Sequence, residues 1–535
     1  MKVELTLYQM LAQSAAKFQY HKALLFRGKY LTYDDLKQKV DYLASGLVDF
    51  GFKKNDVITF ALPNVFEAVF GFYASAKVGV ICHMVHPITP VKQMKKYMSE
   101  TGSQTLVILD TFYNHYQDLL EDDDISFILV NPVNEFNLFT RTIYRLIHRK
   151  KLKGHKQEHI THFSSLYQKK VLNVANINPH ATAVYLHSGG TSGQPKTIEL
   201  SHHAINYLAS QTPYIMGIED FKNKHMLSVL PMFHGFGLCM GIHGMLAVGG
   251  VDTLMPKFNA KKTAQLIAKN QVNYIIGVPS LFESLLKEPA FDSEKMKHVD
   301  QAFIGGDYVS MDLKNRFNKQ MKKNGSLARL LEGYGLTEVV AVACVNTLRE
   351  HDPKTVGKPL PGIDIQIKDL KTDQLLPENE TGEIIIAGPS VMNGYLNDSD
   401  TRDRTFFDIH GKTYVRTGDL GMIDPQGFVH FKQRLKRIIK VLGIPVLPAE
   451  IENFLMDYPQ ISEVCAVSAP DKDMGHVVKL FIVWNQNKEK IPYEDIKQAI
   501  KENISQYAVP KDIVVLDALP KTPIGKIDVL SLEKI

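Results

Sequence analysis

Residues 187–196, HSGGTSGQPK, combine glycines, hydroxyl groups and a lysine in a way that suits the binding of an anion. Glycine lets the backbone approach a ligand closely, and free backbone amides with nearby hydroxyls form a cradle for phosphate oxygens. The spacing differs from a Walker A loop, and Gln194 stands where a hydrolase nucleophile elbow needs glycine. We therefore predict a phosphate-binding loop, with a plain glycine-rich turn as the alternative. Its candidate residues are Ser188, Gly189, Gly190, Thr191, Ser192, Gly193 and Lys196.

Four further segments mix glycine with charged side chains. They are residues 332–338 (EGYGLTE), 414–420 (YVRTGDL), 433–443 (QRLKRIIKVLG) and 520–528 (PKTPIGKID). Each segment taken alone is typical of a turn or of a solvated run of charges, so none of them assigns a function by itself.

The elements that position these segments alternate between helix and strand up to about residue 361. In residues 34–50, Leu36, Val40, Leu43 and Leu47 recur at spacings of three and four, which predicts a helix. Residues 65–77 are also predicted to be helical. Short apolar runs predict strands at 56–62, 79–83, 105–109, 126–130, 183–187, 225–230, 274–278 and 301–305. Such alternation predicts an α/β fold with mainly parallel sheets.

The pattern changes after residue 361, where strands separated by turns are predicted at 364–368, 382–387, 412–416 and 428–432. An α/β pattern resumes after Arg434, with helices at 448–456 and 493–504 and strands at 463–468 and 477–484. We therefore place a boundary near residues 433–437, which separates a C-terminal unit of about 100 residues, within the usual range of domain sizes.

In this order and at these separations, the five segments resemble the adenylate-forming superfamily, which includes acyl-CoA synthetases, peptide-synthetase adenylation domains and firefly luciferase. The resemblance runs from Thr6 to Asp528. It implies a large N-terminal domain of α/β subdomains with a β-rich subdomain, followed by a small, mobile α+β C-terminal domain. The implied bounds are 1–433 for the AMP-binding and acyl-binding domain, 434–436 for a hinge, and 437–535 for the domain that carries a catalytic lysine.

Within the superfamily, the chain is most similar to fatty-acyl-CoA ligases of the long-chain type. Gly189-Gly190, Glu383 and residues 86–90 (HPITP), 231–238 (PMFHGFGL) and 391–395 (VMNGY) follow the pattern of these ligases. The chain departs from the superfamily at Asp307, where alanine is usual beside the adenine, which weakens the assignment of contacts to the base. Further departures are Thr197, Gln433, Arg437 and His476, and none removes a group that the chemistry requires.

The resemblance implies a two-step reaction that uses ATP, Mg²⁺ and CoA. A carboxylate first attacks the α-phosphate of ATP to give an acyl-adenylate and pyrophosphate, and the thiol of CoA then displaces AMP. The reactants of the first step are both anions, so positive charge and positioning must lower its barrier. Besides the loop at 188–196, the implied nucleotide-binding residues are Gly306, Asp307, Tyr334, Gly335, Asp419 and Arg434.

The resemblance also implies roles in catalysis. Thr337 contacts the α-phosphate, and the carboxylate of Glu338 binds Mg²⁺, a hard cation that prefers oxygen ligands. Asp419 has the chemistry to accept both ribose hydroxyls at once. Lys526 bridges the substrate carboxylate and the α-phosphate as charge develops between them.

The remaining implied roles concern the acyl group and CoA. Phe233 and His234 form a gate at the acyl pocket, although a buried structural histidine is an equally weighted reading of His234. Lys436 lies at the hinge. After the C-terminal domain rotates, Lys440 faces the active site and pantetheine passes close to the backbone of Gly443.

Four functions stay open at this point. The leading one is an ATP-dependent ligase that joins a fatty acid to CoA. An aryl or short branched acid, or a carrier-protein pantetheine as acceptor, would keep the same fold and adenylation step. A non-catalytic, membrane-associated lipid-binding protein is the fourth. It is disfavoured because the chain retains the implied catalytic set of Lys196, Glu338, Asp419, Arg434 and Lys526.

Composition excludes other classes. The 535 residues carry a net charge of +5, which is too mild to indicate nucleic-acid binding. The four cysteines, Cys82, Cys239, Cys344 and Cys465, are far apart and form no CxxC pair, so neither a zinc site nor a disulfide scaffold is expected. Cys82 has His83 and His86 as neighbours, but no second ligand pair accompanies them, so we expect ordinary loop histidines. Scattered free cysteines fit a cytoplasmic location.

Residues 136–156 form a separate basic segment. Seven lysines and arginines, more than the whole net charge, lie between Phe136 and Gln157 without any acidic residue. On a helical wheel one arc is apolar and the other basic, followed by a lysine run, which is the pattern of a helix at a membrane surface. The apolar residues are Phe136, Phe139, Ile143, Leu146 and Ile147, and the basic ones are Arg141, Arg145, Arg149, Lys150, Lys151, Lys153 and Lys156. Peripheral membrane contact and a helix packed on the protein both stay open.

Overall fold

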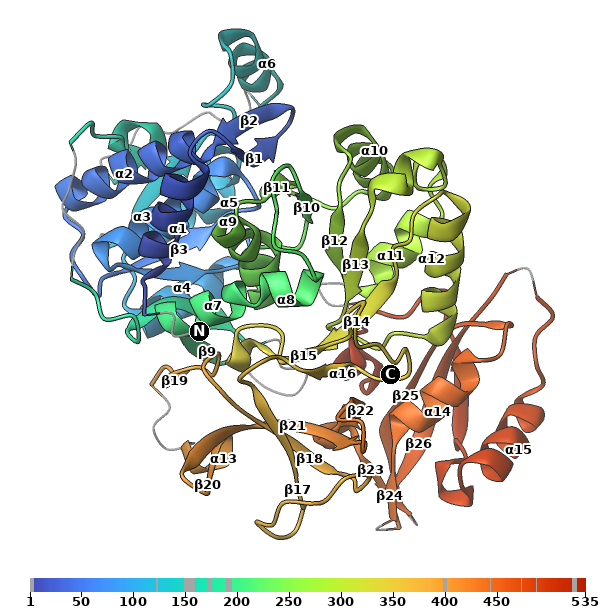
Figure 1. Ribbon diagram of the computed structural model, residues 1–535. Helices are drawn as coiled ribbons and strands as arrows, with labels where there is room; N and C mark the ends of the chain where they lie inside the picture. The colour runs from blue at the N-terminus through green and yellow to red at the C-terminus, as the bar shows by residue number, and fades with distance from the viewer. Residues whose placement is uncertain are drawn as a thin grey trace.

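The computed structural model describes residues 4–121, 124–148, 159–170, 176–188, 195–397, 402–442, 444–472, 474–486, 488–521 and 527–535. Two α/β units stand side by side, and a β-rich unit and a C-terminal unit lie below them in the view of Figure 1. This arrangement confirms the predicted fold class, a large N-terminal part of α/β and β-rich subdomains followed by a smaller C-terminal domain.

The first unit is an eight-stranded sheet in the order β19-β9-β8-β4-β3-β5-β6-β7. The strands from β8 to β7 along this order pair in parallel, whereas β9 and β19 are added antiparallel. The strands are β3 (Val57–Ala61), β4 (Ile81–Met84), β5 (Thr105–Leu109), β6 (Ser126–Val130), β7 (Ile160–His162), β8 (Thr182–His187), β9 (Thr197–Ser201) and β19 (Gly394–Tyr395). The helices of this unit include α1 (Leu7–Phe18), α2 (Tyr33–Phe50), α3 (Phe66–Val78), α4 (Val91–Thr101) and α6 (Leu138–His148).

Helices α2 and α3 illustrate how the sequence sets its own boundaries. Thr32 caps α2 in a capping box with Asp35, and Gly51 ends the helix with a φ of 114°, a conformation that glycine adopts without strain. Every residue of α3 is buried, because apolar side chains surround most of the helix and the buried Lys77 forms an ion pair with Asp41 of α2 at 2.8 Å. The main hydrophobic core therefore runs through this unit and continues toward the second one.

The second unit is a nine-stranded sheet in the order β16-β15-β14-β13-β12-β10-β11-β1-β2. Its strands are β1 (Lys22–Phe26), β2 (Lys29–Thr32), β10 (His225–Ser228), β11 (Val251–Leu254), β12 (Tyr274–Gly277), β13 (Gln301–Ile304), β14 (Leu330–Tyr334), β15 (Cys344–Val345) and β16 (Lys358–Pro359). The helices of residues 202–323 include α7 (His202–Ser210), α8 (Thr212–Met216), the π-helix η4 (Phe236–His243), α9 (Gly244–Val248), α10 (Ala260–Asn270), α11 (Pro279–Leu286) and α12 (Met311–Lys323).

The β-rich unit is antiparallel and comprises β17 (Asp364–Lys368), β18 (Gly382–Ala387), β20 (Phe406–Ile409), β21 (Lys412–Ile423) and β22 (Val429–Arg434). The short helix η9 (Leu435–Arg437) leads from β22 into the C-terminal sheet, which has its own hydrophobic core. That last unit contains β23 (Ile439–Val441), β24 (Ile444–Val446), β25 (Ile461–Asp471), β26 (Gly475–Trp484), β27 (Asp512–Val515), α14 (Pro448–Met456), α15 (Tyr493–Asn503) and α16 (Val529–Leu532). The chain thus changes sheets between Arg434 and Ile439, where the hinge is proposed.

Most predicted elements are confirmed to within a few residues, with one clear exception in the β-rich unit. The strand expected at residues 412–416 continues to Ile423. Thr417 and Gly418 read as a turn in the sequence, and Gly418 has a φ of 68°. The strand nevertheless continues past them, because a bulge absorbs the irregularity in its pairing with β18.

Candidate active site

A cavity of about 840 Å³ opens where the two α/β units, the β-rich unit and η9 meet. Ten of the predicted site residues line it, from positions between 188 and 436 in the sequence. They are Ser188, Lys196, His234, Gly306, Tyr334, Gly335, Thr337, Glu338, Arg434 and Lys436. Of the described candidates, Phe233, Asp307, Asp419 and Lys440 do not line it. Gly189, Gly190, Thr191, Ser192, Gly193, Gly443 and Lys526 lie outside the described residues.

The two ends of the predicted phosphate-binding loop are tied to each other at the cavity edge. The amide of Ser188, just after β8, donates to the carbonyl of Lys196 at 2.9 Å. The amide of Lys196 in turn donates to the Ser188 hydroxyl at 3.0 Å. These two hydrogen bonds join the end of β8 to the start of β9, and Lys196 lines the cavity there.

A pair of buried histidines supports the end of β8. His83 Nε2 lies 2.8 Å from Nε2 of His187, and its Nδ1 lies 3.0 Å from the hydroxyl of Thr59. The ring of Tyr97 stacks on His187 at 3.7 Å between centroids. Burial lowers the pKa of His187 to about 4 and that of His83 well below its usual range, so both rings are neutral near pH 7. The expectation of a loop histidine at position 83 was wrong, since His83 belongs to β4.

Tyr395 joins the predicted phosphate lysine to the predicted metal ligand. Its hydroxyl donates to Glu338 Oε1 at 2.8 Å, and the Lys196 ammonium lies 4.5 Å from the centroid of its ring. Strand β19, which carries Tyr395, pairs with β9 immediately after the loop. The residue therefore holds a cation and a carboxylate at one corner of the cavity. Sequence reasoning did not assign Tyr395 to the site, although it lies in the segment 391–395 that matched the ligase pattern.

Thr337 and Glu338 belong to the short helix η7 (Thr337–Val339), whose position is fixed by close backbone packing. A Cβ atom on Gly335 would lie 1.8 Å from the carbonyl oxygen of Ala341, so only glycine fits between β14 and η7. The amide of Met392 donates to the carbonyl of Glu338 at 2.8 Å. These contacts hold the Thr337 hydroxyl and the Glu338 carboxylate at the cavity wall.

Asp419 and Arg434 are cross-strand partners on β21 and β22. The Tyr334 hydroxyl donates to Asp419 Oδ2 at 2.7 Å, and Arg434 Nε lies 3.6 Å from Oδ1. The Asp419 side chain is buried behind Tyr334, whereas Arg434 lines the cavity. The carboxylate that was expected to contact ribose therefore does not line the cavity itself, but it contacts two side chains that do, Tyr334 and Arg434.

The turn that precedes Asp419 is fixed by a buried ion pair. Glu383 is 3% exposed and accepts hydrogen bonds from Arg416 Nη2 at 2.7 Å and Nε at 3.1 Å. Its other oxygen accepts from the amide of Gly418 at 3.1 Å. Both guanidinium nitrogens donate to the same carboxylate oxygen, and charge-assisted hydrogen bonds are strong, so Glu383 fixes the backbone at Gly418, next to Asp419.

A second part of the cavity lining consists of apolar side chains, and we call it the apolar wall. Its side chains come from α8, η4, β12 and β13, and they are Ile215, Met216, Phe236, Met240, Ile276 and Phe303. His234 lines the cavity at the start of this wall, while the ring of Phe233 packs on His86 with 4.8 Å between centroids. The structure thus brings His234, but not Phe233, to the cavity.

The C-terminal unit reaches the cavity through its connecting segment. Lys436 of η9 lines the cavity. Lys440 lies in β23, where it is exposed and opposite Pro445 in the strand pairing. Asp307 is exposed and does not line the cavity, and its negative charge is one of those that raise the pKa of Arg437 in η9.

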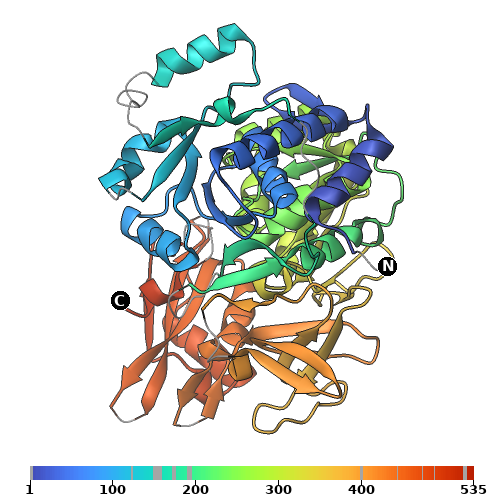
Figure 2. The same ribbon diagram turned by 90° about the vertical axis from the view of Figure 1, so that its left-hand side faces the viewer.

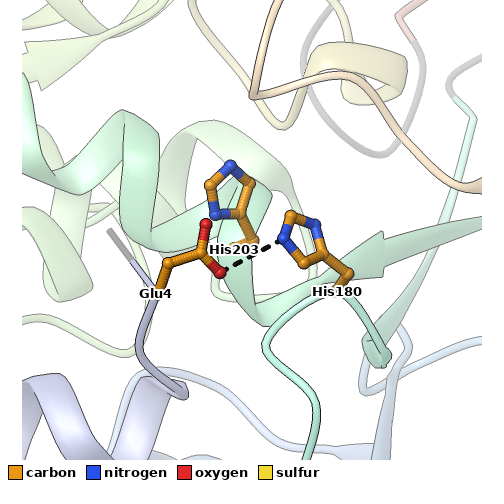
Figure 3. Close-up of side chains that lie close together, drawn as sticks. All are labelled: Glu4, His180 and His203. Carbon is orange, nitrogen blue, oxygen red and sulfur yellow. Dashed lines mark ion pairs between the residues drawn. The ribbon is translucent and has the colours of Figure 1, made fainter. Parts of the chain in front are cut away.

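One group outside the cavity has the side chains to hold a metal. Glu4, His180 and His203 each offer a ligand atom, and these atoms lie within 4.8 Å of one another (Figure 3). His180 Nε2 and Glu4 Oε2 already form an ion pair at 3.3 Å, and both side chains are about half exposed. It is the only group of this type among the residues that the structure describes, so no such cluster forms at the described cavity wall.

Comparison with known proteins decides the family. Residues 11–396 match the model of the AMP-binding enzyme, and residues 450–526 match that of the AMP-binding enzyme C-terminal domain. The chain belongs to the AMP-binding enzyme family. The second match covers most of the unit after η9. This AMP-binding enzyme is thereby a member of the adenylate-forming superfamily of acyl- and aryl-CoA ligases, as its sequence indicated.

Relatives of this AMP-binding enzyme act on different acids. It is 29% identical to the long-chain-fatty-acid–CoA ligase of Bacillus subtilis over 532 residues, which cover 98% of the chain and 93% of that protein. It is also 29% identical to 4-coumarate–CoA ligase 2 of Nicotiana tabacum over 507 residues, covering 93% and 88% respectively. The ATP-bound structure of MatB from Rhodopseudomonas palustris is 20% identical and superposes with a TM-score of 0.85 over 99% of both chains, a likeness that concerns the fold.

Proposed function

We propose that the protein is an ATP-dependent acyl-CoA ligase that activates a fatty acid through an acyl-adenylate and transfers it to CoA. The observation that carries this proposal is the mixed lining of the cavity. Lys196, Glu338 and Arg434 supply charge, and the apolar wall from α8, η4, β12 and β13 supplies hydrocarbon surface. Such a cavity suits a reaction between a polyphosphate and the carboxyl end of an apolar acid.

The chemistry follows from these charges. The carboxylate oxygen forms a bond to the α-phosphorus, the bond from that phosphorus to the bridging oxygen of pyrophosphate breaks, and pyrophosphate leaves. In the second step the sulfur of CoA bonds to the acyl carbon and AMP leaves. In this proposal Lys196 holds the outer phosphates, Thr337 contacts the α-phosphate, and Arg434 approaches the ribose or phosphate. The cations Lys196 and Arg434 offset the repulsion between the two anions.

Mg²⁺, which the family implies, fits the donors present. Glu338 offers a carboxylate oxygen, and Tyr395 orients that carboxylate through its hydrogen bond to Oε1. Magnesium sites in such enzymes take one or two carboxylates and complete their coordination with phosphate and water oxygens. A bound Mg²⁺ supplies positive charge beside the phosphates, and the residue that would hold it is Glu338.

The choice of a fatty acid over other acids rests on the cavity wall. None of the six residues of the apolar wall carries a charge or a hydrogen-bonding group suited to a second polar end of the substrate. An aryl or short branched acid, or a carrier-protein pantetheine as acceptor, is the alternative within the same chemistry. We keep the 434–436 hinge, a cytoplasmic location and the absence of a nucleic-acid partner as parts of the proposal.

A pyrophosphate-release assay with a panel of acids tests this function. The panel contains saturated acids of increasing length, 4-coumarate, benzoate and a short branched acid, each with ATP and with or without CoA. We expect the highest kcat/KM with a long or medium saturated acid, and AMP and acyl-CoA in equal amounts. If kcat/KM were highest with an aryl acid, the substrate would be an aryl acid and not a fatty acid. The absence of turnover with any acid would favour a non-catalytic lipid-binding protein.

Met240→Trp should shorten the acids that the enzyme accepts. Met240 lies on η4 in the apolar wall and is 4% exposed, so a larger side chain fills part of the cavity. We expect kcat/KM for long acids to fall about tenfold or more, as for the loss of one or two buried methylene contacts, with short acids spared. Met240→Leu, which conserves volume, serves as the control. An equal fall of kcat/KM for acids of all chain lengths would mean that the acyl chain does not bind beside Met240.

Lys436→Pro should separate the two half-reactions. Proline fixes φ, and a fixed φ in η9 blocks the rotation of the C-terminal domain that the second step needs. We expect ATP–pyrophosphate exchange to continue while CoA thioester formation falls. Lys436→Ala removes the same cation from the cavity but leaves the backbone free, so it should retain both steps better. Normal thioester formation by a folded Lys436→Pro variant would move the hinge to other residues.

A further inference from the structure

Helix α6 turns its apolar side chains away from the protein. Leu138, Phe139, Leu146 and Ile147 are between 64% and 76% exposed, and Ile143 is 39% exposed. At 100° per residue these five side chains occupy one continuous half of the helix. In Figures 1 and 2 the helix lies at the outer edge of the first unit, beyond β1 and β2. A surface helix of a globular protein normally shows the opposite orientation, with its apolar stripe facing the core.

The polar half of α6 is the half that contacts the protein. Tyr144, the only buried residue of the helix, donates its hydroxyl to Asp110 Oδ1 at 2.5 Å. The ring of His148, one turn later, packs against Tyr144 with 4.6 Å between centroids. Asn137 caps the start of the helix by accepting from the amide of Thr140 at 2.9 Å. The bond from Tyr144 to Asp110 orients the helix on the protein, and the exposed fractions of its apolar side chains show that the apolar half points outward. A helix packed on the protein through its apolar face is therefore wrong for α6.

The charge around this apolar half selects the type of partner. No acidic residue occurs from Phe136 to Gln157, and seven lysines and arginines do. Arg141 and Arg145 lie on α6, and the other five, Arg149, Lys150, Lys151, Lys153 and Lys156, lie outside the described residues. An exposed apolar patch marks a site of interaction, and cations on the same helix favour an anionic surface. Two copies of the chain joined through the same patch would bring the cations of one helix near those of the other, which opposes a symmetric dimer. Within the described residues, no helix is long and apolar enough to cross a bilayer.

We propose that α6 docks the protein on an anionic phospholipid bilayer, with Phe139, Leu146 and Ile147 inserted among the acyl chains at the interface. The partner that covers the patch is thus the membrane leaflet that faces the protein. The proposal does not depend on the ligase activity. If the proposed function also holds, docking brings the cavity to the compartment into which its apolar substrate partitions.

The four cysteines of the chain are all buried, which allows a direct test of insertion. Leu146→Cys supplies an exposed thiol on the patch for an environment-sensitive fluorophore such as NBD. Leu327→Cys, at a side chain that is 90% exposed and remote from α6 in sequence, is the matched control. On mixing with phosphatidylglycerol vesicles at low salt, we expect brighter, blue-shifted emission from the label at position 146 and no change at position 327. Phosphatidylcholine vesicles should give a much smaller response.

Vesicle sedimentation then separates the apolar and the charge contributions. Phe139→Ser with Ile147→Ser should weaken the partition coefficient roughly tenfold per side chain lost from the interface. Arg145→Glu should weaken it roughly fivefold or more, and added salt should weaken wild-type binding in the same direction. Leu327→Ser and Lys490→Glu, both at exposed positions outside α6, should bind as wild type does.

Two results would overturn the proposal. The first is an unchanged emission at position 146, or equal sedimentation of the wild type and the Phe139→Ser, Ile147→Ser variant, with circular dichroism confirming that both are folded. The second is a blue shift that appears without vesicles and rises with protein concentration, because this would assign the patch to a second copy of the chain. Ligase assays with a water-soluble short acid should be unaffected by the α6 variants, so failure of the membrane test and failure of the proposed function can be told apart.

Discussion

Replacing Asp419 by alanine should raise the KM for ATP by roughly 100-fold or more, with a smaller effect on the KM for the acid. Asp419 is a buried carboxylate that pairs with Arg434 across two strands and accepts the Tyr334 hydroxyl. Two hydrogen bonds from ribose hydroxyls to a charged acceptor are each worth about 1.5–3 kcal/mol. The resemblance to the superfamily implies that Asp419 accepts both ribose hydroxyls, so the variant would lose both of these bonds together with the contacts to Tyr334 and Arg434. Initial rates at varied ATP and saturating acid measure the effect.

Asp424→Ala is the control for Asp419→Ala. Asp424 ends the same β-hairpin, where it accepts from His430 Nε2 and from the amides of Gln426 and Phe428. These bonds stay within the hairpin and involve neither Tyr334 nor Arg434, the cavity-lining side chains that Asp419 contacts, so the loss of Asp424 should lower the stability of the hairpin without a selective effect on ATP. A KM for ATP that changes equally in both variants would mean that Asp419 acts through the stability of the hairpin. Tyr334→Phe then tests whether Tyr334 is needed to hold the carboxylate.

Sequence reasoning located the elements of this fold well where periodicity and burial agree. The strands at 105–109, 126–130, 364–368 and 382–387 and the helix at 448–456 have the predicted bounds. Short strands such as β15 and β16, of two residues each, carry no periodic signal. They form because β15 pairs with the edge of β14 and β16 then pairs with β15. The extension of β21 depends on a bulge, and pairing across a bulge is a tertiary property that local pattern does not contain.

The sequence motifs predicted those parts of the candidate site that lie within the motifs themselves. Lys196, Thr337, Glu338 and Arg434 all reach one cavity. Tyr395 was not assigned, because its role arises only when β19 pairs with β9 and brings it between Lys196 and Glu338. The helical wheel of α6 likewise predicted an apolar and a basic face, but it could not show which of the two faces the protein and which faces solvent. A single hydrogen bond from Tyr144 to Asp110, a residue of another segment, decides which face meets solvent.

Lys526→Ala should abolish adenylate formation and spare thioester formation from a supplied acyl-adenylate. Lys526 lies outside the described residues, and the expectation rests on its place in the segment 520–528 that resembles the superfamily. An ammonium that bridges the carboxylate and the α-phosphate acts where charge develops, and the loss of one such contact costs about 10²–10³ in rate. ATP–pyrophosphate exchange measures the first step, and release of AMP from acyl-adenylate and CoA measures the second.

Lys521→Ala provides a matched lysine five residues earlier in the same segment. Lys521 forms an ion pair with Glu463 at 2.6 Å, so its charge is already engaged within the C-terminal unit. We expect this variant to adenylate at close to the wild-type rate, because an exposed pair of this kind contributes little to stability. Exchange that survives in Lys526→Ala, or that falls equally in both variants, would exclude Lys526 as the bridging cation. A loss confined to Lys526→Ala and to the first half-reaction would assign to it the charge that joins the two anionic substrates.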